Sequence, residues 1–127
     1  MRRQWLGGEG GPLPDLLAED VVIEMPFARP GGPSRIEGRA AFLAFAEPRR
    51  AAFPVRFEAV REVAVHDTAD PEVIVVEYEL EGTVTTTGHR ASARFIGVLR
   101  ARDGRIVLWR EYQNTQAIAE ALEYRPS

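Results

Sequence analysis

The pair Asp103-Gly104 constrains the fold of this chain more than any other feature of its sequence. It stands between two runs of branched and aromatic residues, the second over 105–114, and this arrangement is the strongest short-range signal of a β-hairpin. Alternate side chains of a strand point to opposite faces, so Trp109 and Glu111 share one face. Because Arg110 suits the solvated face, Glu111 falls on the core side, where a carboxylate needs either a buried partner or a chemical role.

The remaining elements are predicted from hydrophobic periodicity and from Pro and Gly punctuation. The pattern indicates short helices and a short strand first, then a run of longer strands, over 14–18 (helix), 21–25 (strand ended by Pro26), 38–47 (helix ended by Pro48), 55–66, 73–83 and 91–102 (strands) and 116–124 (tail helix). Helices ahead of an antiparallel meander are typical of an α+β fold with helices on one face of the sheet. The acidic face of 73–83 and the arginines of its neighbours predict cross-strand ion pairs on the outer surface.

Composition limits the class of protein. The 127 residues suit one domain, which we assign to 1–127, with 1–12 expected to form a poorly ordered or short helical start. A net charge of −3 argues against a nucleic-acid partner, and all 16 basic residues are Arg, which excludes lysine Schiff-base chemistry. The chain has no Cys, and its two His match no metal-ligand spacing. Without an apolar run of membrane-spanning length or a signal-peptide core, we expect a cytoplasmic protein with no membrane partner.

The order of these elements, together with Ala18-Glu19-Asp20-Val21-Val22-Ile23-Glu24-Met25-Pro26, Gly38-Arg39 and Arg110-Glu111-Tyr112, resembles the nuclear transport factor 2-like superfamily. Within it the chain is most similar to SnoaL-like polyketide cyclases, ketosteroid isomerases and phenazine-biosynthesis A/B proteins. The resemblance runs from about Leu13 to Leu122. It implies a cone-shaped, strongly bent antiparallel sheet wrapped around helices and enclosing an apolar pocket. It also implies a homodimer through the outer sheet face, where Ile96, Val98, Leu108 and Tyr112 stand among the charges.

The departures from these relatives bear on the reaction. Met25 stands where ketosteroid isomerases carry a catalytic Asp, and Gly97 stands near the place of their second Asp, so steroid isomerisation does not carry over. The Asp-Arg-Asp set of limonene-epoxide hydrolases is not visible either. The segment 110–114 resembles phenazine A/B proteins, in which the equivalent glutamate handles protons, although Thr115 replaces their usual proline.

The predicted site centres on Glu111 as the catalytic group in an apolar pocket. Aromatic and sulfur side chains are expected in the core or as pocket lining, and polar groups are expected to orient a carbonyl or carboxylate of the substrate. The candidate substrate-binding residues are Trp109, Gln113, Phe95, Met25, Phe27, Phe42, Phe57, His89 and Arg39. Each has a structural alternative: Glu111 as a buried carboxylate held by an Arg or by backbone donors, His89 as a solvated strand end, and Arg39 as a surface residue at a helix start.

Three functions follow from this pattern. The first is a cofactor-independent, metal-independent acid/base enzyme, of isomerase, cyclase or dehydratase type, acting on a hydrophobic cyclic substrate related to polyketides, steroids or phenazine precursors. The second is a non-catalytic binding protein for a small hydrophobic ligand, and the third is a structural dimer with a filled cavity. The enzyme is favoured because an unpaired buried carboxylate is costly in a filled core.

Overall fold

The computed structural model describes residues 14–125, so the expectation for residues 1–12 lies outside the described part. The described elements follow one another as a short 3₁₀ turn, two strands, a helix, four strands and a final helix: η1 (Pro14–Leu16), β1 (Leu17–Glu24), β2 (Arg35–Glu37), α1 (Arg39–Ala52), β3 (Val55–Asp67), β4 (Val73–Val84), β5 (Arg90–Arg102), β6 (Arg105–Tyr112) and α2 (Thr115–Glu123). The α+β class and the long strands predicted from sequence are confirmed.

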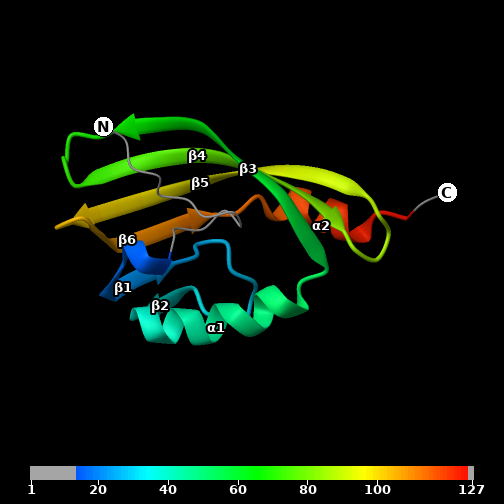
Figure 1. Ribbon diagram of the computed structural model, residues 1–127, viewed down its shortest axis with the longest axis horizontal. Helices are drawn as coiled ribbons and strands as arrows, with labels where there is room; N and C mark the ends of the chain where they lie inside the picture. The colour runs from blue at the N-terminus through cyan, green and yellow to red at the C-terminus, as the bar shows by residue number, and fades with distance from the viewer. Residues whose placement is uncertain (1–13, 126–127) are drawn as a thin grey trace.

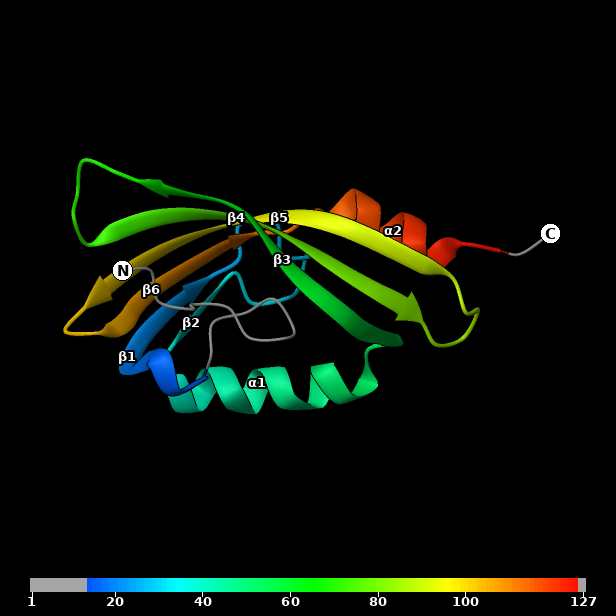
Figure 2. The same ribbon diagram turned by 45° about the horizontal axis from the view of Figure 1, so that its top comes forward.

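The six strands form one sheet in the order β2-β1-β6-β5-β4-β3. The sheet curls strongly over α1, with α2 near the end of β6 (Figures 1 and 2). It is mixed rather than wholly antiparallel, because β1 runs parallel to β6, with Ile23 opposite Trp109. Residue alternation predicts a strand but not its partner, so the sequence did not reveal this pairing. The three-residue β2, which pairs antiparallel to β1, was not predicted.

The β5–β6 hairpin forms at the predicted position. Asp103 and Gly104 both have positive φ angles, 54° and 77°, as the two central residues of a type I′ turn require. The turn brings Leu99 opposite Trp109 and Gly97 opposite Glu111. The hairpin therefore fixes which side chains of β5 lie next to the candidate catalytic residue.

Two helix predictions need correction. The turn at 14–18 is shorter than predicted, because β1 already begins at Leu17. Helix α1 does not end at Pro48 but continues to Ala52. A proline inside a helix frees the carbonyl of the residue four positions earlier. That residue is Ala44, which is exposed, so water can satisfy its carbonyl at the surface.

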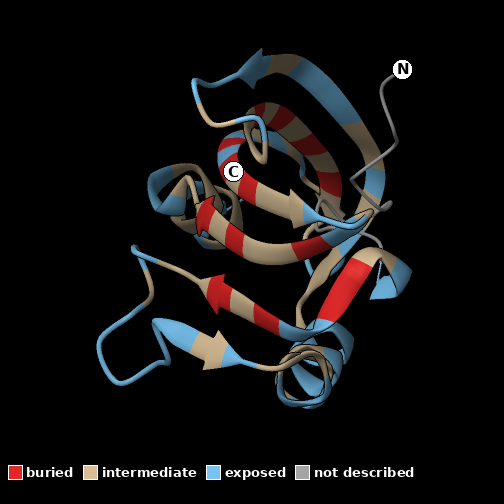
Figure 3. Ribbon diagram, turned by 90° about the vertical axis from the view of Figure 1, so that its left-hand side faces the viewer, coloured by how far each residue is buried: buried red, intermediate tan, exposed pale blue. Residues whose placement is uncertain are grey.

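The hydrophobic core lies inside the curl of the sheet. Buried residues alternate with more exposed ones along β4 and β5, and Figure 3 shows this banding along the strands. Tyr78, Leu99 and Ile106 are among the side chains shielded almost completely from solvent. On the other face, Arg61 pairs with Glu79 at 2.9 Å and with Glu81 at 3.0 Å. The predicted cross-strand ion pairs are therefore present. No helix among residues 14–125 is long and apolar enough to cross a membrane.

Candidate active site

A cavity of about 210 Å³ lies within the described part of the chain. Its walls come from the beginning of β3, the end of β4, the beginning of β5, the segment 111–113 and one side of α2, with Phe53 after α1. Sixteen residues line it, and only Ser92, Glu111 and Gln113 among them have polar side chains. The site is therefore an apolar chamber with a few polar groups, the usual composition of a small-molecule pocket.

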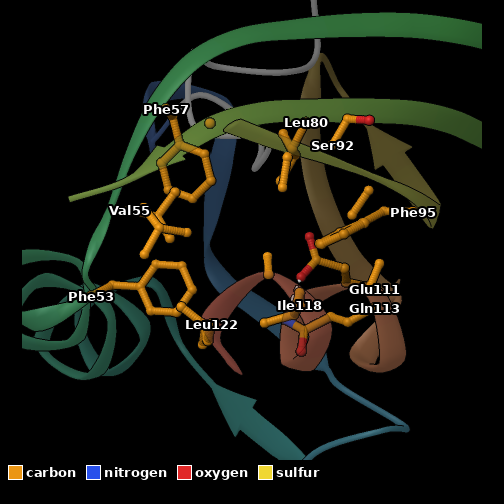
Figure 4. Close-up of a pocket in the computed structure, with 16 residues that line it drawn as sticks. Phe53, Val55, Phe57, Leu80, Ser92, Phe95, Glu111, Gln113, Ile118 and Leu122 are labelled. Atoms are coloured by element: carbon orange, nitrogen blue, oxygen red, sulfur yellow. Dashed lines mark hydrogen bonds between the residues drawn. The ribbon is translucent and has the colours of Figure 1, made fainter. Parts of the chain in front are cut away.

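The polar groups are not spread evenly around this cavity. Glu111 and Gln113 lie together at one end, next to Phe95, whereas Phe53, Val55 and Phe57 lie at the other end (Figure 4). Between them, α2 contributes Ile118 and Leu122. A ligand in this cavity meets hydrogen-bonding groups at one end and hydrocarbon along the rest of its length.

Strand β6 carries Glu111 into the cavity by simple alternation. Trp109 and Glu111 are both on the inner face, and Glu111 is only 9% exposed. One carboxylate oxygen, Oε2, accepts a hydrogen bond from the Tyr78 hydroxyl at 2.5 Å. The other, Oε1, accepts one from Nε2 of Gln113 at 2.8 Å. Both of these partners are neutral donors, so in the described part of the chain the carboxylate is held by hydrogen bonds from neutral groups rather than by an arginine.

This environment shifts the acidity of Glu111. Burial raises the pKa of its carboxyl, because the charged form loses the stabilisation that water provides. The hydrogen bonds from Tyr78 and Gln113 stabilise the charged form and offset part of this rise in pKa. Burial, with a smaller effect from the neighbouring carboxylate, also raises the pKa of Tyr78. Tyr78 therefore keeps its proton at neutral pH, whereas the carboxyl of Glu111 takes up a proton more readily than an ordinary glutamate.

Tyr78 reaches Glu111 because β5, which lies between β4 and β6, provides room at Gly97. Gly97 pairs with Val76 on one side and Glu111 on the other. A Cβ atom built on Gly97 would lie 3.6 Å from Cε1 of Tyr78 and 3.5 Å from Nε1 of Trp109. The two rings therefore cover this glycine at ordinary contact distance, and a side chain larger than alanine there would displace the ring that holds the carboxylate.

Four residues of the sequence-predicted site lie together in the cavity lining: Glu111, Gln113, Phe95 and Phe57. Three others do not line it and belong to packing elsewhere. Trp109 is buried in the core, where it meets Phe42 edge to face with ring centroids 5.7 Å apart. Phe27 is 56% exposed and packs edge-on against Tyr112.

The remaining predicted residues also lie outside the lining. The backbone amide of Met25 donates a hydrogen bond to the carbonyl of Ser34 at 2.8 Å. Arg39 donates from Nη1 to the carbonyl of Leu17 at 3.4 Å, so it braces the start of α1 against β1. His89 stacks on Tyr124 with ring centroids 3.9 Å apart, beyond the end of α2.

The sequence reasoning missed Tyr78 and the contribution of α2. Along β4, Tyr78 alternates with the charged outer face and lies between the buried Val76 and Leu80, and a buried tyrosine hydroxyl normally needs a partner. That requirement, joined to an unpaired inward carboxylate, was the available signal for the Tyr78–Glu111 bond. No comparable signal existed for α2, because an amphipathic helix does not reveal which surface it covers. Among the described residues, no group of three or more His, Asp or Glu side chains is arranged to hold a metal ion.

Comparison with known proteins agrees with this architecture. The model of the SnoaL-like domain matches residues 5–109. Over 108 residues, the chain is 36% identical to an uncharacterized PhzA/B-like protein of Pseudomonas aeruginosa, a match that covers 85% of this chain and 74% of that relative.

Two solved structures show the same fold. The structure named "Putative Isomerase" from Bacillus subtilis is 32% identical, with a TM-score of 0.75 over 86% of this chain and 77% of the other. The "Putative SnoaL-like polyketide cyclase" from Jannaschia sp. is 18% identical, with a TM-score of 0.67 over 88% of this chain and 76% of the other. At 18% identity, the second likeness concerns the fold alone.

Proposed function

Because the chain belongs to the SnoaL-like domain family, we propose that it is an acid/base enzyme for small hydrophobic ring compounds, with Glu111 as the proton-handling residue. The fold and family support a small-molecule-pocket protein. The isomerase name of the 32% identical Bacillus subtilis structure favours proton transfer without net hydrolysis. The reaction class is therefore proton removal next to a carbonyl, followed by return of the proton at another atom.

The observation that carries this proposal is the setting of Glu111. It lies at one end of an apolar cavity, and its hydrogen-bond partners among the described residues are the neutral donors Tyr78 and Gln113. An arginine partner would hold the carboxylate ionised. Here burial raises its pKa instead, and a general base works best when its pKa lies near the operating pH.

The proposed step uses no other reactant. Ionised Glu111 takes a proton from the carbon next to the substrate carbonyl, and the electron pair of that C–H bond moves to form an enolate. Glu111, now neutral, returns the proton to a different position, so the product is an isomer and the enzyme is restored. Tyr78 holds one carboxylate oxygen throughout. The amide of Gln113 is the other polar group in the lining that can donate to the enolate oxygen, because the side chain of Ser92 is exposed on the outer face of β5.

Exchange of carbon-bound hydrogen tests this function without knowledge of the natural substrate. We expect the protein to accelerate exchange of the α-hydrogens of 2-tetralone for deuterium in D₂O, followed by proton NMR. Glu111→Gln preserves the side-chain volume and removes the base, so the rate should fall by roughly 10²–10⁴-fold. Glu120→Gln, on the exposed side of α2, is the matched control and should keep the wild-type rate.

The binding-protein alternative gives a different result in the same experiment. If 2-tetralone binds in the cavity but exchanges no faster than in buffer, the protein is a carrier and the enzyme proposal is wrong. Equal exchange rates in the wild-type protein and Glu111→Gln would also reject Glu111 as the base.

A further inference from the structure

We propose that this cavity selects uncharged molecules of one or two rings that carry one hydrogen-bonding group, and that it rejects ring compounds bearing a carboxylate. This inference rests on the proposed function in one respect: both take the cavity as the ligand site. It narrows the substrate class, because the sequence leaves polyketide-, steroid- and phenazine-precursor-like compounds open and allows Arg39 or His89 to orient either a carbonyl or a carboxylate.

The first argument is charge. Of the described lining residues, none is Arg or His, and Glu111 is the ionisable one. Arg39 is bonded to the backbone of β1, and His89 is stacked on Tyr124. A ligand carboxylate in this cavity would meet a protein carboxylate and no cation. Removing an unpaired charge from water is strongly unfavourable.

The arginines next in sequence to the lining residues point the other way. Arg56 lies between Val55 and Phe57, yet its side chain is exposed and pairs with Glu58 at 3.0 Å. Arg90 precedes the lining residue Ala91 and pairs with Glu81 at 2.8 Å on the outer face. Strand alternation thus places positive charge on the convex side of the sheet and hydrocarbon on the concave side.

The second argument is size. A cavity of about 150 Å³ lined by aliphatic and aromatic side chains holds one benzene molecule, whereas sites for drug-sized ligands span about 300–1,000 Å³. The present cavity of about 210 Å³ lies between these limits. One substituted ring or two fused rings fill this volume, whereas a four-ring skeleton would extend beyond the lined space.

The third argument is the position of the polar groups. Glu111 and Gln113 share one end of the cavity, opposite Phe53, Val55 and Phe57 (Figure 4). Neutral Glu111 can donate a hydrogen bond to a ligand carbonyl, and ionised Glu111 can accept one from a ligand hydroxyl. Both protonation states therefore favour a ligand that is polar at one end and uncharged.

A matched pair of bicyclic probes tests the selection. At pH 7.5, 2-naphthol is neutral and 2-naphthoate carries a negative charge on the same ring system. By calorimetric titration, we expect 2-naphthol to bind at least about tenfold more tightly than 2-naphthoate. Glu111→Gln should reduce that ratio, because it removes the like charge. A neutral four-ring steroid ketone should show no binding at the concentration that saturates with 2-naphthol.

A second variant locates the binding. Ala121 lines the cavity from α2, so Ala121→Trp should fill the chamber and abolish 2-naphthol binding, while circular dichroism and the melting transition report that the fold is kept. The proposal is overturned if 2-naphthoate binds as tightly as 2-naphthol, if the steroid competes with 2-naphthol, or if the folded Ala121→Trp protein still binds.

The outcomes for this inference and for the enzyme proposal are separate. Selective binding of 2-naphthol without exchange of 2-tetralone supports the ligand class and rejects the enzyme. Glu111-dependent exchange together with tighter binding of 2-naphthoate supports the enzyme and rejects the ligand class.

Discussion

Glu111 is the residue whose position was most predictable and whose partners were least predictable. Alternation from Trp109 was enough to place it on the inner face of β6. The choice between a structural ion pair and a titrating group depended on Tyr78, which is 33 positions away in the chain. Such a contact is set by the pairing of β4, β5 and β6, and no local pattern reports it.

Burial of Glu111 has a stability cost that depends on pH. Because the native pKa is raised, the native state keeps a proton that the unfolded chain loses above about pH 4.3. Stability therefore falls as pH rises from that value through the native pKa. We expect Glu111→Gln to be more stable than wild type at pH 8 by about 0.5–2 kcal/mol, with the gain shrinking toward pH 4.5. Urea unfolding at both pH values measures this, with Glu120→Gln as control. A variant less stable than wild type at pH 8 would contradict the expectation.

The Tyr78 hydroxyl should lower the pKa of Glu111 without being essential for the fold. Tyr78→Phe removes the donor to Oε2 and leaves the ring in place, so the charged carboxylate loses stabilisation. We expect the pKa of Glu111 to rise further in this variant, with a loss of about 1–3 kcal/mol in the free energy of unfolding at neutral pH. Carbon-13 NMR of the glutamate carboxyl groups provides the titration. An unchanged or lower pKa would show that the Tyr78 hydroxyl does not stabilise the charged form of Glu111.

At the scale of elements, the predictable features were those with local signals. The Asp-Gly turn, the alternating strands and the amphipathic tail helix all follow from short stretches of sequence. The parallel β1–β6 pair and the continuation of α1 through Pro48 do not, because a strand's partner and the solvation of a freed carbonyl are set by tertiary structure. Strand alternation also explains why four of the predicted site residues share the cavity: Phe57, Phe95 and Glu111 lie on inner strand faces, and Gln113 follows directly after β6.

Helix α2 forms one wall of the cavity and begins at a polar cap. The Oδ1 atom of Asn114 accepts a hydrogen bond from the backbone amide of Ala117 at 3.1 Å. Asn114→Ala should cost about 0.5–2 kcal/mol in the free energy of unfolding and should weaken 2-naphthol binding, since Ala117 and Ile118 line the cavity. Asn114→Asp keeps a capping oxygen and should restore most of both. Wild-type stability and affinity in Asn114→Ala would show that the cap does not support the site.

At the scale of the whole molecule, the outer sheet face carries a patch of exposed apolar side chains. Ile96 is 42% exposed and pairs in register with Tyr112, against which the exposed Phe27 packs. Apolar residues bordered by ion pairs suit a two-fold interface, so we propose a homodimer through this face. Sedimentation velocity at micromolar concentration should give a dimer for wild type and a monomer for Ile96→Arg. A monomeric wild type, or an unchanged dimer in Ile96→Arg, would contradict this.

The central claim is that Glu111 titrates inside the cavity and responds to what fills it. The most direct test is the carbon-13 titration of its carboxyl group in the wild-type protein, assigned by the signal missing from Glu111→Gln. We predict a midpoint above the ordinary glutamate value of about 4.3, and a further change when 2-tetralone is bound, because the ligand displaces water from the cavity. A midpoint at or below that value, unaffected by 2-tetralone, would mean that Glu111 is a fixed structural charge and would contradict the account.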